Sequence, residues 1–175
     1  MTVGAQGAAP PAARPQSGLP DDTQAGPLIF LVAGEPSGDL LGARLMAALT
    51  AQTGGSVRFA GVGGAAMARE GLNSLVPIAE LSVMGLLEVI PHLPRILGHL
   101  RRTVQAARRL HPAAVVTIDS PNFSLEVAKR LAGGGAPLIH FVAPSVWAWK
   151  PWRARRIARY LDHLLTLLPF EPPYF

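Results

Sequence analysis

The chain has 175 residues, enough for one domain of ordinary size and too few for two full α/β domains. Apolar residues make up 49% of it and charged residues 15%, so the chain can bury a core and is not a disordered, charge-rich polymer. It contains no cysteine, which excludes a disulfide framework, a cysteine-based zinc site and a thiol nucleophile. The formal net charge is +5, and ten of the sixteen cations lie in two acid-free stretches, 95–109 and 150–159, so we expect an anionic partner.

Residues 1–26 are rich in Ala, Gly and Pro and show no apolar periodicity. They also lack the basic start and the apolar core of a secretory signal, so we expect a disordered tail. The folded domain is expected over residues 27–175. No apolar run in it approaches the ~18 residues that a membrane-spanning helix needs, so we expect no transmembrane helix.

From Pro27 onward, short apolar runs alternate with helical patterns, which is typical of βα units around a parallel sheet covered on both faces. The expected strands are Leu28–Ala33, Val57–Val62, a weak Ser74–Pro77, Ala114–Asp119, Leu138–Val142 and His163–Leu167. The expected helices are Gly38–Ala51, Ala65–Glu70, Pro94–Leu110, Ser124–Leu131 and Trp152–Tyr160.

Ligands of an open parallel sheet bind beyond the carboxyl ends of its strands, so candidate site residues are those that follow each apolar run. After the first expected strand, residues 34–39 (GEPSGD) form a loop of small and polar residues that opens into a helix, whose N-terminus favours anions. The loop lacks the GxGxxG pattern and the lysine of a P-loop. An ordinary turn in which Ser37 or Asp39 caps the helix is an equal alternative.

Two further strand ends carry candidate residues. Gly63 and Gly64 follow the second expected strand and resemble a glycine-rich phosphate loop only loosely. Asp119, followed by Ser120, ends an otherwise apolar strand, where a carboxylate would be held rigidly and partly desolvated, as a general base requires. The alternative is that Asp119 caps a turn or the next helix.

All three tryptophans of the chain lie within six positions after the fifth expected strand, in the segment that also holds Ser145. Trp147 and Trp149 could stack on a ring, line an acyl pocket or anchor at a membrane interface, and local packing is the alternative. The five histidines have no metal-ligand spacing and no cysteine partner, so no metal site is expected. His140 lies inside an apolar run and is interpreted as a satisfied core histidine.

The helix expected over 94–110 is amphipathic, with one apolar arc and one arginine face that includes Arg101 and Arg102. A solvated outer helix is the ordinary interpretation, and contact with anionic lipid is the alternative. The run 81–90 before it has apolar residues on every side of a helical wheel, which indicates either a buried helix or an apolar wedge that docks on lipid beside the arginine face.

Taken together and in this order, five motifs resemble the lipid-A-disaccharide synthase family. They are Val32–Asp39 (VAGEPSGD), Gly61–Gly64 (GVGG), Val83–Gly85 (VMG), Ile118–Pro121 (IDSP) and Pro144–Trp149 (PSVWAW). Each motif alone is modest, but the ordered set is specific. The resemblance covers the chain from Leu28 to its end, including the closing LPFE at 168–171.

The resemblance implies half of a GT-B glycosyltransferase, which has two Rossmann-like domains that face each other across a cleft. Such an enzyme transfers 2,3-diacylglucosamine from UDP-2,3-diacylglucosamine to 2,3-diacylglucosamine 1-phosphate and releases UDP. It would invert the anomeric centre without a metal or another cofactor. It would work in the cytoplasm as a peripheral protein of the anionic inner-membrane surface, and full-length members can be homodimers.

The resemblance also implies roles for residues. Asp119 would be the catalytic base and Glu35 an assisting polar residue. The residues expected to bind substrate are Gly34, Ser37, Asp39, Gly63, Gly64, Ser120, Ser145, Trp147 and Trp149. The residues expected to contact acyl chains or membrane are Val83, Met84, Leu86, Leu87, Arg101 and Arg102.

The chain departs from the family pattern in two respects. It has Asn122 and Ser124 around Phe123, where the family usually carries Asp and then Asn, so a role for a second carboxylate is not carried over. It is also too short to hold the second Rossmann-like domain, where the family's nucleotide-sugar site largely lies. We therefore expect an N-terminal portion with little or no transferase activity of its own.

Two other functions would fit parts of the sequence. A Rossmann oxidoreductase domain predicts GxGxxG after the first strand, which is absent. A non-enzymatic module could dock on anionic membrane through residues 81–109, with salt-sensitive binding. Charge alone would allow a nucleic-acid partner, but no other feature supports one, and none is expected.

Overall fold

The computed structural model describes residues 26–81, 86–144 and 152–175, without the side chains of 86–91. Several expectations therefore lie outside the described residues. These concern the tail up to residue 25, Val83, Met84, Ser145, Trp147, Trp149, and the side chains of Leu86 and Leu87.

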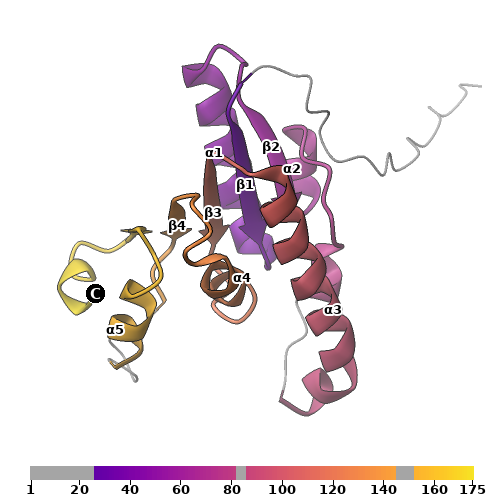
Figure 1. Ribbon diagram of the computed structural model, residues 1–175, viewed down its shortest axis with the longest axis vertical. Helices are drawn as coiled ribbons and strands as arrows, with labels where there is room; N and C mark the ends of the chain where they lie inside the picture. The colour runs from indigo at the N-terminus through magenta and orange to yellow at the C-terminus, as the bar shows by residue number, and fades with distance from the viewer. Residues whose placement is uncertain (1–25, 82–85, 145–151) are drawn as a thin grey trace, which may run out of the picture.

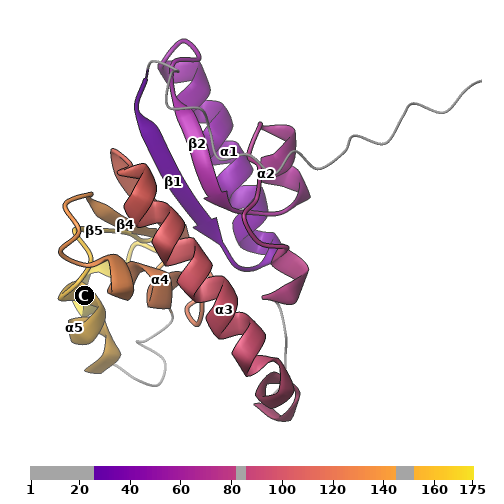
Figure 2. The same ribbon diagram turned by 45° about the vertical axis from the view of Figure 1, so that its right-hand side comes forward.

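Five parallel strands form one sheet in the order β2-β1-β3-β4-β5 (Figures 1 and 2). The strands are β1 Leu28–Ala33, β2 Arg58–Val62, β3 Ala114–Ile118, β4 Leu138–Phe141 and β5 His163–Leu165. The helices are α1 Pro36–Gln52, α2 Ala65–Arg69, α3 Leu86–Leu110, α4 Ser124–Leu131 and α5 Trp152–Ala158, with short 3-10 turns at Ile78–Glu80 and Pro172–Tyr174. The expected α/β fold with a parallel sheet is confirmed.

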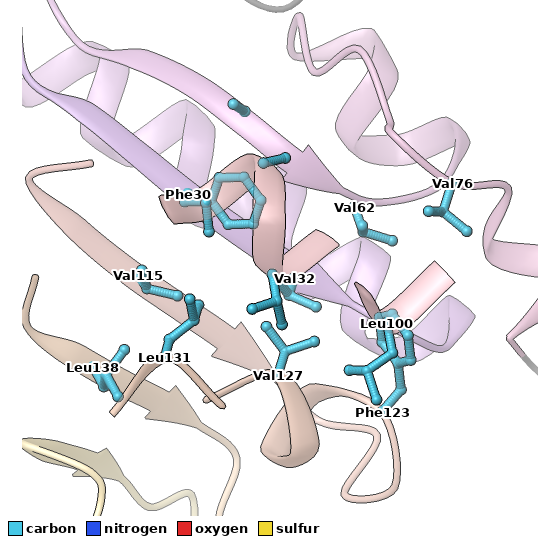
Figure 3. Close-up of a cluster of buried hydrophobic side chains, with 14 of the residues drawn as sticks. Phe30, Val32, Val62, Val76, Leu100, Val115, Phe123, Val127, Leu131 and Leu138 are labelled. Carbon is cyan, nitrogen blue, oxygen red and sulfur yellow. The ribbon is translucent and has the colours of Figure 1, made fainter. Parts of the chain in front are cut away.

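Helices cover both faces of the sheet because successive side chains of each strand point to opposite sides. On one face, Leu31 and Ala33 of β1 pack in a core with Met46 of α1 and Met67 of α2. On the other face, the alternate residues of the strands pack against α3 and α4. Figure 3 shows this second core, in which Phe30 and Val32 of β1 lie among side chains from α3 and α4.

Helix α3 is amphipathic as expected. Leu100, Val104 and Ala107 are buried against the sheet, and the five arginines from 95 to 109 are exposed. Its start was predicted wrongly, because α3 begins at Leu86 and passes through Pro91 and Pro94. Figure 2 shows its N-terminal part extending beyond the end of the sheet. Among the described residues, no helix combines the length and the apolar composition that crossing a bilayer requires.

The weak strand predicted at Ser74–Pro77 is wrong: this segment makes only an isolated bridge from Ser74 to Gly61. β3 and β4 each end one residue earlier than predicted, because Asp119 (φ 48°) and Val142 (φ 76°) leave the extended conformation for the left-handed region. Strands β1 and β3 pair up to Ala33 and Ile118, so the loops after them leave the sheet side by side. This edge positions the candidate site.

Candidate functional site

The loop after β3 has an unusual backbone. Asp119 (φ 48°) and Ser120 (φ 45°) both have left-handed conformations, which cost a non-glycine residue about 1 kcal/mol or more. The Asp119 N–H donates to the carbonyl of Phe141 on β4 at 2.9 Å, which holds the turn against the sheet. Two strained residues in succession are typical of a functional site.

Ser37 reaches Asp119 from the neighbouring loop. Its hydroxyl Oγ, in the first turn of α1, donates a 2.7 Å hydrogen bond to Oδ2 of Asp119. No side chain of the described residues caps the N-terminus of α1, whose N-cap residue is Glu35 in an extended conformation. The alternative in which Ser37 or Asp39 caps α1 is therefore wrong, and the hydroxyl of Ser37 donates to the Asp119 carboxylate instead.

Gly34 and Gly38 allow these two loops to approach closely. A Cβ at Gly34 would lie 2.5 Å from Oγ and 2.9 Å from Cβ of Ser120, and a Cβ at Gly38 would lie 3.2 Å from the carbonyl oxygen of Ile118. The structure thus brings Gly34, Ser37, Asp119 and Ser120 together at one edge of the sheet, as expected. Half-buried Glu35 belongs to the same loop.

Asp39 has a structural role that the sequence did not reveal. Its buried carboxylate accepts hydrogen bonds from the N–H groups of Gly64 (2.7 Å), Ala66 (2.9 Å) and Met67 (3.0 Å). It therefore caps α2, a helix 25 residues further along the chain, and its negative charge suits the N-terminus of that helix.

The glycine pair 63–64 differs from an open phosphate loop. The N–H of Gly64 is taken by Asp39, and the N–H of Gly63 donates to Oγ of Ser74 at 3.1 Å. A Cβ at Gly64 would lie 2.6 Å from Oδ2 of Asp39, so the glycine is required for the approach of this carboxylate. A protein carboxylate thus occupies the donors that a bound phosphate would use, and tight packing accounts for both glycines.

Ser124, one of the departures from the family pattern, is fully buried. Its Oγ lies 3.3 Å from the carbonyl oxygen of Val32 and 3.2 Å from that of Ile118, at the ends of β1 and β3. A small hydroxyl side chain at this position joins α4 to the two strands that carry the site loops. Ser124 was not among the expected site residues, and its position is visible only in the tertiary structure.

His140 on β4 is buried beside the site, as expected for a core histidine, but it is only partly satisfied. Its Nδ1 lies 2.8 Å from Oγ1 of Thr117, and its Nε2 has no hydrogen-bond partner among the described residues. Burial lowers the pKa of His140 from 6.5 to about 4, and the nearby Asp119 carboxylate opposes part of this shift. The imidazole is therefore neutral at pH 7.

Within the described residues, no three His, Asp or Glu side chains are grouped so that they could hold a metal ion. Arg101 and Arg102 lie exposed on the middle of α3. The site edge is formed by the loops after β1 and β3, and α3 belongs to the layer that packs on one face of the sheet.

Comparison with known proteins identifies the family. A sequence model described as lipid-A-disaccharide synthetase matches residues 29–175. The chain belongs to the lipid-A-disaccharide synthase family. Relatives named lipid-A-disaccharide synthase include those of Rhodospirillum centenum (59% identical over 150 residues), Paramagnetospirillum magneticum (55% over 150) and Ruegeria pomeroyi (51% over 165). These matches cover 85%, 85% and 92% of the chain, but only 37%, 38% and 41% of the respective relatives.

Among solved structures, the chain is similar to MurG of Acinetobacter baumannii, with a TM-score of 0.51 and 15% sequence identity. The likeness covers 83% of this chain and 42% of MurG. At this identity the likeness concerns the fold alone. It agrees with the expectation that the chain has the fold of one half of a GT-B glycosyltransferase. The resemblance inferred from the five motifs is thereby confirmed at the level of family and fold.

Proposed function

We propose that this chain is the acceptor-side part of a lipid-A-disaccharide synthase. The full enzyme would transfer 2,3-diacylglucosamine from its UDP derivative to 2,3-diacylglucosamine 1-phosphate and release UDP. The observation that carries the proposal is the hydrogen bond from Ser37 to Asp119 at the carboxyl edge of the sheet. The chain spans about 40% of the length of its relatives, and we assign the groups that hold UDP to the remainder.

Asp119 would act as the general base. The acceptor's sugar hydroxyl attacks the anomeric carbon of the donor as its proton passes to the Asp119 carboxylate. The bond from that carbon to the UDP oxygen breaks at the same time, its electron pair leaves with UDP, and the anomeric centre inverts. The hydrogen bond from Ser37 to Oδ2 would orient the carboxylate, and Oδ1 would take the proton.

The neighbouring residues would shape the acceptor side of the cleft. Gly34 keeps the first loop within contact of Ser120, so nothing bulky lies between the two loops at that point. Glu35, the half-buried last residue before α1, would assist as a polar group near the acceptor. Asp39, by contrast, would act indirectly, because its capping of α2 holds the glycine loop against the sheet.

Helix α3 would bring the enzyme to its lipid substrates. Its exposed surface carries Arg101 and Arg102, and Leu93 (46% exposed) and Leu97 (37%) lie nearer its start. Exposed leucines followed by arginines suit docking at an anionic membrane surface, where the leucines enter the acyl boundary and the arginines meet the headgroups. Contact with the inner membrane would then supply both diacylated sugars.

A chimera tests the proposal. The 175 residues are joined to the C-terminal remainder of the R. centenum relative, and UDP release is measured with both diacylated substrates. We expect activity from the chimera and little or none from the chain alone, because only the chimera has both sides of the cleft. A chimera that folds and leaves both substrates unconverted, with Asp119 intact, would show that the assignment is wrong.

A further inference from the structure

A small hollow of about 140 Å³ lies between α4 and α5, apart from the edge where Ser37 meets Asp119. It is formed because Leu125 of α4 packs with Ala154 and Ile157 of α5 in a buried cluster of its own. Figures 1 and 2 both show α5 beside α4. We name this hollow the α4–α5 pocket, and its lining residues are Pro121, Leu125, Glu126, Lys129, Trp152, Arg153, Arg156, Ile157 and Tyr160.

The α4–α5 pocket carries an excess of positive charge. Three cations line it, Lys129 from α4 and Arg153 and Arg156 from α5, against one carboxylate, Glu126. That carboxylate already forms an ion pair with Arg130 one turn further along α4. Among the described residues, no ion pair engages Lys129, Arg153 or Arg156, so the pocket favours an anion.

Arg153 and Arg156 line the hollow together with Tyr160. Burial raises the pKa of the Tyr160 phenol, the Glu126 carboxylate raises it further, and Arg156 and Arg153 oppose the rise. Guanidinium groups bind phosphate oxygens through paired N–H donors, so a phosphate matches this lining.

The pocket is close in sequence to the candidate active site. Pro121, on its wall, follows Asp119 by two residues. On its rim, the Trp152 indole is 62% exposed and offers a flat apolar surface with one N–H donor. A ligand with a ring and a phosphate would use both features, the ring on the indole and the phosphate among the cations.

We propose that the α4–α5 pocket binds the phosphate of a phosphorylated sugar, with Arg153 and Arg156 as its main phosphate ligands. This inference rests on the proposed function, in which the acceptor is a sugar 1-phosphate whose hydroxyl must reach Asp119. The pocket would hold the phosphate end of that acceptor and direct the opposite part of the sugar toward the base. Its role is substrate positioning, because no bond to the phosphate is made or broken.

Binding to the 175-residue chain is measured by titration calorimetry with glucosamine 1-phosphate, inorganic phosphate, glycerol 1-phosphate and glucosamine. We expect glucosamine 1-phosphate to bind most tightly, because only it combines ring and phosphate. The double variant R153Q/R156Q should weaken this binding by about 10-fold or more. The control R44Q/R69Q removes the same charge from exposed positions on α1 and α2 and should leave it unchanged.

Three results would overturn the inference. Equal weakening by both double variants would indicate general attraction by the net charge. Glycerol 1-phosphate binding as tightly as glucosamine 1-phosphate would indicate a lipid headgroup as the ligand. Absence of saturable binding by glucosamine 1-phosphate would show that the pocket is not a binding site for a phosphorylated sugar.

Kinetics of the chimera separate this inference from the proposed function. R153Q/R156Q should raise the KM for the acceptor with little change in kcat, because the pocket holds substrate and takes no part in bond making. An inactive chimera whose glucosamine 1-phosphate binding still depends on Arg153 and Arg156 would refute the proposed function and retain the pocket. An active chimera whose acceptor KM is unaffected by the double variant would support the proposed function and refute the phosphate site in the pocket.

Discussion

The Ser37 hydroxyl donates a 2.7 Å hydrogen bond to Oδ2 of Asp119, although the two residues are 82 positions apart in the chain. The contact exists because β1 and β3 are neighbours in the sheet and pair in register up to Ala33 and Ile118. The loops that follow these strands therefore leave the same edge together. The first of them starts α1, and the second carries the strained Asp119.

In the chimera, Asp119→Asn should lower kcat by about 10²–10⁴-fold, because the amide cannot take the proton of the acceptor hydroxyl. Ser37→Ala should lower it by about 10-fold, the value of one hydrogen bond that orients a charged group. Steady-state UDP release measures both changes. Glu70→Gln, an exposed carboxylate at the end of α2, is the matched control. Similar losses in all three variants would argue against a specific role for Asp119.

Asp39→Ala should destabilise the chain by about 2–4 kcal/mol, because three backbone N–H groups at the start of α2 lose their acceptor together. The free energy of unfolding in urea, followed by circular dichroism, measures the change. Glu70→Ala removes an exposed carboxylate from the same region and should change stability by less than about 0.5 kcal/mol. If Asp39 served substrate only, the two variants would be equally stable.

Gly34→Ala should destabilise the fold by about 1–3 kcal/mol, because the new Cβ would meet Oγ and Cβ of Ser120 at 2.5 and 2.9 Å. Adding Ser120→Gly removes both atoms and suits the left-handed backbone at that position. The double variant should therefore recover most of the loss in a urea-unfolding mutant cycle. Purely additive effects of the two substitutions would show that the contact does not limit the approach of the loops.

His140 should make stability depend on pH between about 4 and 6.5. Its pKa falls from 6.5 to about 4 on folding, so in this window the unfolded chain binds a proton that the folded chain does not. Stability is highest above pH 6.5, falls as the pH drops through the window, and has lost at most about 3 kcal/mol from this group below pH 4. Urea unfolding at pH 7 and pH 4.5 should show a smaller loss for His140→Gln than for the parent chain. Equal losses would mean that His140 does not titrate as its burial predicts.

The double variant R101Q/R102Q should weaken binding to vesicles that contain phosphatidylglycerol by up to about 30-fold, at ~1 kcal/mol for each arginine near an anionic surface. The effect should shrink as salt is raised, because screening reduces attraction between exposed charges. Vesicle sedimentation measures it. R44Q/R69Q, which removes the same charge elsewhere, should bind as the parent chain does. Equal binding of the parent chain to neutral phosphatidylcholine vesicles would contradict the electrostatic contribution.

Much of the fold could be predicted from local patterns. Strand β1 and helix α4 have the predicted bounds, and the apolar arc of α3 is buried as its periodicity requires. These features depend on side chains close in sequence, since an element's buried face follows from its own period of two or 3.6 residues. The five motifs in their order were likewise sufficient to predict the family, and they suggested Asp119 as the candidate base.

Contacts between distant segments depended on strand order and register, which no local pattern contains. Asp39, one alternative for which was a cap of its own helix, caps α2. Three other features also depend on contacts between distant segments. They are the left-handed turn at Asp119, the buried Ser124 that joins two strand ends, and Nε2 of His140, which has no hydrogen-bond partner within the part of the chain that the structure describes. The α4–α5 pocket also depends on such contacts, because its cations come from two helices that meet only when the sheet has formed. Sequence patterns report which residues are buried or polar, and the packing of the β1, β3 and β4 ends determines which of them share a site.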